Sequence, residues 1–273
     1  MRKLLLAIAY IFSACSSSEE ERAHSCPGEY IYRLTSDTPL EINPYISKPK
    51  PLYPWQSDTS ASNGLKSITK EYFRCKGFSL NPPKVIKSPE GKETARYTDC
   101  GGCQKHSLSV RNKKEYIFPI LLELVNHIQT VTKKQVIITS GHRCPDHNSY
   151  IDPSPQNSGS KHLIGAACDF YIKGLEAHPE VAVKIIQEFY RNDARYQKQK
   201  EYQEFRRFEK ATNVATHPWL NKEVFIKLFK ANEGRDEDNR HSYPYICLQV
   251  RFDRERNVPL TFTWTDAQNY LRK

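Results

Sequence analysis

The sequence lacks a long hydrophobic run after its first fifteen residues. Hydrophobic residues make up 38% of the 273 positions, and the mean hydropathy is −0.70. A helix that crosses a bilayer needs roughly 20 mostly apolar residues, so a protein with several membrane spans is excluded. The chain also has no internal repeat. Aromatic residues are not scarce, and their share of 11% argues against a disordered chain.

Acidic residues are too few to balance the basic ones. The chain has 31 Asp and Glu against 41 Lys and Arg, which gives a net charge of +10 and a pI of about 9.1. This charge favours an anionic partner such as cell-wall polymer, lipid headgroups or nucleic acid. No nucleic-acid-binding motif accompanies the charge, so we expect no nucleic-acid partner. The length predicts one or two domains with a sizeable core.

The N-terminus has the pattern of an export signal. Two basic residues precede an apolar run at 4–12, and small residues follow. Positions 12–15 (FSAC) resemble a bacterial lipobox, in which Cys15 is acylated and becomes the first residue of the mature chain. The sequence therefore predicts a lipoprotein signal peptide at 1–14 and a polar tether at 15–23. Ordinary secretion is the alternative.

This N-terminus predicts a location in the cell envelope. A lipid on Cys15 would anchor the protein to a membrane, with the domain facing the periplasm. Ser16, rather than Asp, follows the lipid-bearing cysteine, which slightly favours the outer membrane. Export also permits disulfides. The chain has eight cysteines, at positions 15, 26, 75, 100, 103, 144, 168 and 247.

Seven cysteines are left once Cys15 is set aside, and an odd number leaves at least one thiol unpaired or bound to a metal. Cys100 and Cys103 have the C-x-x-C spacing of redox motifs, but they do not open an obvious thioredoxin-like unit. We expect disulfides or a tight turn there, and a redox lipoprotein is the least favoured function. His106 could complete a zinc knuckle, although no fourth ligand is evident.

The remaining sequence divides into an irregular region and a mixed domain. Residues 24–110 are rich in Pro and Tyr, and we expect loops and short strands. The helical spacing of apolar residues predicts helices at 115–132, 179–200 and 221–231, and Pro119 suits the first turn of the first of them. The many charged residues at 190–212 predict a solvated helix there. Strands are predicted at 135–139, 166–172, 245–252 and 260–264. The expected class is α+β, with a domain at 111–273 and a charged helical insert at about 190–240.

The most informative motif lies at 160–169 (SKHLIGAACD) and has the form S-x-H-x-x-G-x-A-x-D. His162 and Asp169 are seven residues apart, so they do not share a helix face cleanly. They can share a site if His162 ends a loop and Asp169 lies on the strand behind it. The small residues at 165–167 would let the backbone turn close to an ion. Imidazole and carboxylate are suitable zinc ligands. A buried structural histidine with a capping aspartate is the alternative.

This motif resembles the signature of the M15 peptidases, the zinc D-alanyl-D-alanine carboxypeptidases and related peptidoglycan endopeptidases. Their S-G-x-R element is matched at 140–143 (SGHR). The resemblance covers about 115–260 and implies a Hedgehog/DD-peptidase-like fold with a small antiparallel sheet and flanking helices. It implies a Zn²⁺ cofactor held by His162 and Asp169. It also implies that Arg143 holds the substrate carboxylate or the polarised carbonyl oxygen of a peptidoglycan stem peptide, at a bond involving a D-amino acid.

The third zinc ligand departs from the family pattern. In the family a histidine opens the C-terminal strand, and Cys247 stands at that place here. Thiolate is a competent zinc ligand. Strand alternation should point Cys247 toward the cleft and its aliphatic neighbours toward the core. The family's acid, three residues before this ligand, is Pro244 here, and Pro cannot act as a base.

Two alternatives follow from this departure. His241 could be the third ligand with Asp238 as the general base, since the two have D-x-x-H spacing. The protein could instead be a catalytically degenerate M15-fold module that binds the cell wall or organises the envelope. With Cys247 as ligand, turnover should be low unless Asp238 or another loop acid supplies the base.

The lipobox reading generates a test of anchoring. Cys15→Ala removes the only atom in the motif that can carry the lipid, so the variant should leave the membrane fraction. Fractionation of cells followed by immunoblotting checks this. A variant that still sediments with membranes after a salt wash would show that a lipid on Cys15 is not the anchor.

Overall fold

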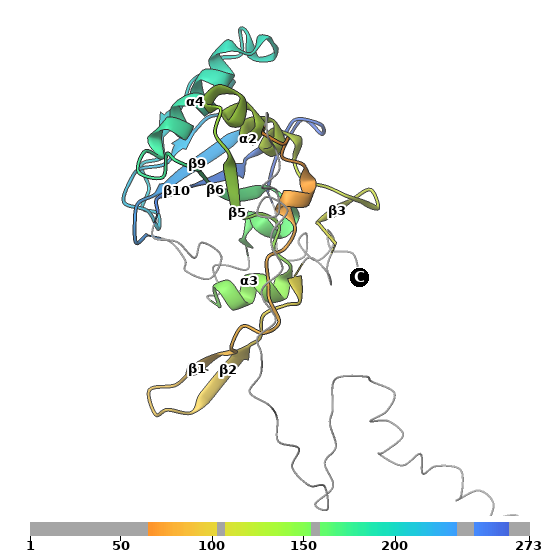
Figure 1. Ribbon diagram of the computed structural model, residues 1–273, viewed down its shortest axis with the longest axis vertical. Helices are drawn as coiled ribbons and strands as arrows, with labels where there is room; N and C mark the ends of the chain where they lie inside the picture. The colour runs from red at the N-terminus through yellow and green to blue at the C-terminus, as the bar shows by residue number, and fades with distance from the viewer. Residues whose placement is uncertain (1–64, 103–106, 154–158, 234–242, 262–273) are drawn as a thin grey trace, which may run out of the picture. The chain divides into compact units, whose positions relative to one another are not determined.

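The computed structural model describes residues 65–102, 107–153, 159–233 and 243–261 (Figure 1). All described residues belong to one compact unit, Lys50–Lys273. The predicted signal peptide and tether with Cys15 lie outside the described residues. So do Cys103, His106, Asp238 and His241. No helix among the described residues is long and apolar enough to cross a membrane.

The domain is built on a six-stranded sheet in which every neighbouring pair is antiparallel. In sheet order the strands are β5 (Val136–Ser140), β6 (Ala167–Ile172), β10 (Tyr245–Val250), β9 (Val224–Phe229), β8 (Trp219–Leu220) and β7 (Arg206–Arg207). The long helices α2 (Pro119–Thr132) and α4 (Glu180–Asn192) pack against each other, and α2 also contacts β5 and β10. The α+β class with an antiparallel sheet and flanking helices is therefore confirmed.

Shorter elements surround this sheet. The hairpin of β1 (Lys84–Lys87) and β2 (Glu93–Tyr97) contacts α3 (Pro145–Ile151) through β2. The remaining elements are η1 (Lys70–Phe73), β3 (Val110–Arg111), β4 (Lys114–Glu115), η4 (Lys161–Ile164), η5 (Ala194–Tyr196), α5 (Lys200–Gln203), β11 (Phe252–Asp253) and β12 (Val258–Pro259). η1 contacts β5, so chain from the Pro- and Tyr-rich region packs directly on the sheet.

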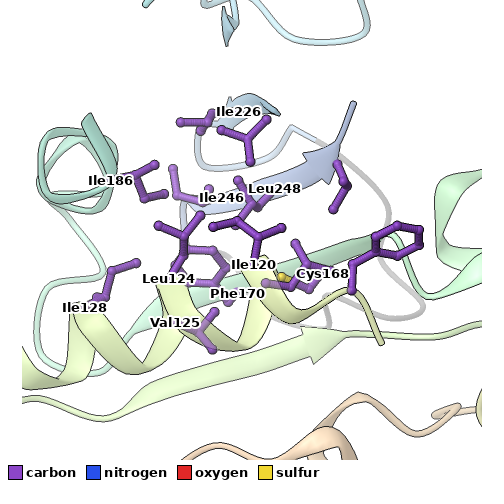
Figure 2. Close-up of a cluster of buried hydrophobic side chains, with 14 of the residues drawn as sticks. Ile120, Leu124, Val125, Ile128, Cys168, Phe170, Ile186, Ile226, Ile246 and Leu248 are labelled. Atoms are coloured by element: carbon purple, nitrogen blue, oxygen red, sulfur yellow. The ribbon is translucent and has the colours of Figure 1, made fainter. Parts of the chain in front are cut away.

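The core lies between the sheet and the long helices, and Figure 2 shows part of it. Successive side chains of a strand point to opposite faces, and on β6 and β10 the even-numbered positions face this core. They include Cys168, Phe170, Ile246 and Leu248, all fully or almost fully buried. Helix α2 adds a stripe at helical spacing, consisting of Ile120, Leu121, Leu124, Val125 and Ile128.

The predicted bounds of helix α2 are close to those observed. Pro119 occupies its first turn, where the missing N–H costs nothing because that position has no partner within the helix. The helix ends at Thr132, and Lys133 adopts a left-handed conformation with φ of 55°. The strands predicted at 135–139 and 166–172 are β5 and β6, shifted by about one residue.

The prediction of a helix at 221–231 is wrong. Residues 224–229 form strand β9 instead, and Val224, Ile226 and Leu228 are buried on one face of it. That spacing of two residues is the period of a strand, not of a helix. A strand is also the state that β-branched and aromatic residues favour.

The predicted charged helix at 190–212 is wrong as well. Helix α4 ends at Asn192, well short of the expected 200. The side chain of Asp193 accepts a hydrogen bond from the Arg195 amide and so starts the short helix η5. The described part of the predicted helical insert at about 190–240 therefore contains short helices and the strands β7, β8 and β9.

Gly165 reverses the chain between η4 and β6. Its φ is +68°, a left-handed conformation that only glycine adopts at little cost. A Cβ built on Gly165 would lie 2.4 Å from Ser109 Oγ and 2.9 Å from the Tyr116 carbonyl oxygen. The S-x-H-x-x-G-x-A-x-D motif therefore has glycine at this position because the turn needs a positive φ and leaves no room for a side chain.

Gly165→Ala should therefore destabilise the domain. We expect the left-handed conformation alone to lower the free energy of unfolding by about 1–2 kcal/mol, and the close contacts to add to this. Gly159→Ala is a matched control, because a Cβ there meets nothing within 4 Å. Urea unfolding of both variants checks the prediction, which fails if the two are equally stable.

Candidate metal centre

Three of the predicted site residues come together in one buried group. His162 on η4, Asp169 on β6 and Cys247 on β10 each offer a ligand atom, and these atoms all lie within 4.8 Å of one another. All three residues are buried, with exposed fractions of 4–5%. An imidazole, a carboxylate and a thiol at this separation form a donor set that can surround a single metal ion.

The sheet register places two of these ligands side by side. Cys247 is the cross-strand partner of Asp169 in the antiparallel β6–β10 pair. Directly opposite residues have their side chains on the same face of the sheet, with Cβ atoms roughly 4.5–5.5 Å apart. Cys168 and Leu248, the next residues along each strand, point to the core instead (Figure 2).

His162 is oriented by the backbone of the S-G-x-R segment. Its Nδ1 lies 2.7 Å from the Gly141 carbonyl oxygen. A carbonyl oxygen only accepts hydrogen bonds, so Nδ1 carries the proton and donates it. This leaves the Nε2 lone pair for a metal, and Nε2 lies 3.5 Å from Asp169 Oδ1. Such a hydrogen bond behind a histidine ligand fixes its tautomer and ring orientation.

The close approach of the Phe73 backbone requires glycine at position 141. A Cβ at this position would lie 2.5 Å from the Phe73 carbonyl oxygen and 2.5 Å from its Cα. The adjacent His142 amide donates to the same Phe73 oxygen at 2.7 Å. Because the chain from η1 passes so close, a larger residue at 141 would displace the carbonyl that orients His162.

Arg143 lies beside the group and is held at several points. Its Nη2 is 3.4 Å from Asp169 Oδ2, and its Nε donates to Ser140 Oγ at 3.0 Å. Its backbone amide donates to the His162 carbonyl oxygen at 3.1 Å. The S-G-x-R segment thus holds the buried guanidinium of Arg143 in a fixed position beside the Asp169 carboxylate.

The carboxylate is ionised in this environment. Burial by itself would raise the pKa of Asp169, but His162 and Arg143 outweigh it and lower the pKa to about 2. The thiol behaves in the opposite way, because burial and the negative charge of Asp169 raise the pKa of Cys247. A divalent cation reverses this effect and deprotonates a coordinating thiol. The donor chemistry of the three residues therefore fits zinc.

The rest of the predicted site is divided. Asp238 and His241, the alternative base and ligand, lie outside the described residues. Pro244 directly precedes β10.

The sequence analysis did not identify Ser140 and Gly141 as the residues that support Arg143 and His162. The signal was present, since both belong to the S-G-x-R motif. It also missed Lys161, whose amine binds the Val250 carbonyl and whose pKa burial lowers to about 8.

These features define a buried group of three residues on an antiparallel sheet that could hold a zinc ion. Residues 98–202 match a family model described as Peptidase M15, and this match supports the membership of the M15 peptidase family that the sequence predicted. Members of this family depend on zinc. The matched segment contains Arg143, His162 and Asp169 and ends before Cys247. Comparisons with curated proteins and with solved structures find no match.

The centre predicts how substitutions change zinc binding. His162→Ala and Cys247→Ser should each weaken zinc binding by more than about 100-fold, since losing even a supporting residue commonly costs 10–100-fold. Cys247→His should retain zinc, because imidazole suits the same place. Competition with a chelator of known affinity measures these constants.

His241→Ala is the control for this series and should change zinc affinity little. The reverse pattern, with zinc lost in His241→Ala and kept in Cys247→Ser, would move the third ligand to the 238–241 segment. It would also make Asp238 the natural base beside it.

Proposed function

We propose that the protein is a zinc peptidase that cleaves the stem peptide of peptidoglycan at a bond involving a D-amino acid. The observation that carries the proposal is the buried group of His162, Asp169 and Cys247 with Arg143 beside it, within an M15 peptidase domain. His162, Asp169 and Cys247 would hold the ion. When bound, zinc supplies a Lewis acid that polarises the scissile carbonyl and acidifies a bound water.

Arg143 is the substrate-positioning residue in this proposal. Its contacts with Ser140 and Asp169 hold the guanidinium in one orientation before substrate arrives. A planar guanidinium matches the two oxygens of a carboxylate and can equally stabilise the negative charge that develops on a carbonyl oxygen. A fixed cation performs either task at little cost in reorganisation.

The proton acceptor comes from outside the three-residue group. Asp169 is committed to His162 and Arg143, and its lowered pKa makes it a weak base. Pro244 has no side chain that can accept a proton. We assign the role of general base to Asp238, on the sequence pattern alone.

A non-catalytic module that binds the cell wall is the second candidate function. The observation that favours it is Pro244 at the place of the family's acid. Such a module would keep Arg143 and the metal-binding group and would bind stem peptides without cutting them. We also propose that the protein is a periplasm-facing lipoprotein anchored through Cys15, with the outer membrane slightly favoured, and both functions agree with this location.

Digestion of purified muropeptides tests the proposal. We expect release of free D-alanine or cleavage of cross-linked dimers, which mass spectrometry separates. Peptides that end in L-Ala-L-Ala should be resistant. Arg143→Lys keeps the charge but loses the planar fork, and we expect kcat/KM to fall by roughly 10²–10³-fold, as for other charge-stabilising groups.

His162→Ala is the inactive control for this digestion. Zinc-loaded wild type that binds muropeptides without cutting them would contradict the enzyme and support the wall-binding module. Absence of both binding and cleavage would contradict both functions.

A further inference from the structure

A second group of potential metal ligands lies apart from the candidate catalytic centre. Cys75, Cys100 and Cys144 are all buried, and their sulfur atoms lie within 4.8 Å of one another. Cys75 Sγ and Cys100 Sγ are 3.6 Å apart. None of the three belongs to the group of His162, Asp169 and Cys247, and the proposed mechanism uses none of them.

The three cysteines come from three separate segments. Cys75 follows η1, Cys100 follows β2, and Cys144 precedes α3. In the sequence they are 25 and 44 residues apart, so only the folded domain brings them together. Three segments that are far apart in the sequence thus each contribute one cysteine to the same cluster, as segments do around a structural metal ion.

The backbone around the sulfurs is suited to thiolates. The Gly102 amide donates to Cys100 Sγ at 3.3 Å, and the His147 amide donates to Cys144 Sγ at 3.4 Å. Hydrogen bonds to an ionised group favour its charged form. Backbone amides directed at sulfur therefore support the state of cysteine that binds a metal.

Two glycines make room for this arrangement. A Cβ on Gly77 would lie 2.2 Å from Cys100 Sγ, and a Cβ on Gly102 would lie 2.3 Å from the Gly77 carbonyl oxygen. Gly102 also has φ of +70°. The chain is therefore packed against the sulfur cluster as closely as glycine allows.

A polar pair adjoins the cluster. Asp99 Oδ1 lies 2.6 Å from His147 Nδ1, and these two residues form a group with Cys100 whose ligand atoms also lie within 4.8 Å of one another. Cys100 belongs to both groups. An ion on the three sulfurs would therefore have a nitrogen and a carboxylate close by.

We propose that Cys75, Cys100 and Cys144 bind a second, structural zinc ion. Three thiolates are soft ligands, and they favour zinc over calcium or magnesium. A structural zinc takes four ligands, so a fourth donor completes the site. A disulfide could join only two of the three sulfurs and would leave the third as a buried thiol.

The ion would fix the 65–102 segment to the catalytic region. Cys144 directly follows Arg143, and Cys75 lies two residues after Phe73, whose carbonyl binds the His142 amide. The sulfur cluster and the orienting segment 140–143 are thus continuous in the chain. Loss of this ion should loosen the support of the catalytic centre without removing its ligands.

Zinc content of the purified full chain tests the inference. Elemental analysis should find two zinc ions per chain in the wild type and one in the His162→Ala/Asp169→Ala variant. Cys75→Ser should also retain one, and the combined variant none. Cys168→Ala is the matched control, because its buried sulfur faces the hydrophobic core (Figure 2), and it should keep two.

X-ray absorption of the His162→Ala/Asp169→Ala variant examines the cluster with all three of its cysteines in place, so no cysteine substitution can disturb folding. It should show about three sulfur neighbours at about 2.3 Å from zinc. The inference is overturned if this variant holds no zinc. It is also overturned if thiol titration of the unreduced wild type shows two of the three cysteines joined as a disulfide. Neither result depends on peptidase activity, so the proposed function is tested separately.

Discussion

The antiparallel pairing of β6 with β10 is the constraint on which the candidate catalytic centre depends. It sets Asp169 directly opposite Cys247, although the two are 78 residues apart in the sequence. The same pairing sends their neighbours Cys168 and Leu248 into the core. Because strand side chains alternate, a slip of one residue would exchange the two faces. The burial of the apolar face therefore fixes the position of the ligands.

The proximity of His162, Asp169 and Cys247 could be predicted from the sequence, for a physical reason. The seven-residue spacing of His162 and Asp169 requires a turn between them, and Gly165 provides that turn with its positive φ. Alternation along 245–250 separates metal-capable from aliphatic side chains, so the direction of Cys247 could be inferred. The boundaries of α2 could likewise be inferred from Pro119 and the apolar stripe.

Other parts could not be inferred, because their decisive contacts are made only in the folded domain. In β9 the large residues Phe225 and Phe229 lie on the face opposite the core, so apolar residues occur on both faces and the alternation is partly hidden. Cys75, Cys100 and Cys144 give no local signal of their proximity. Connectivity among cysteines cannot be deduced from spacing alone, and the expectation of disulfides or a turn at Cys100 came from its C-x-x-C spacing and from the predicted export.

Charge explains why a buried centre of this kind would select an anionic substrate. Without a metal, the ionised Asp169 balances Arg143, and the raised pKa of Cys247 keeps that thiol neutral. A divalent cation together with a deprotonated Cys247 adds a net positive charge to this balance. Uncompensated charge is costly in a buried place, so the loaded site gains most from an anionic group. In the proposed function, a stem-peptide carboxylate, or the negative charge that develops on a cleaved carbonyl, would supply that group.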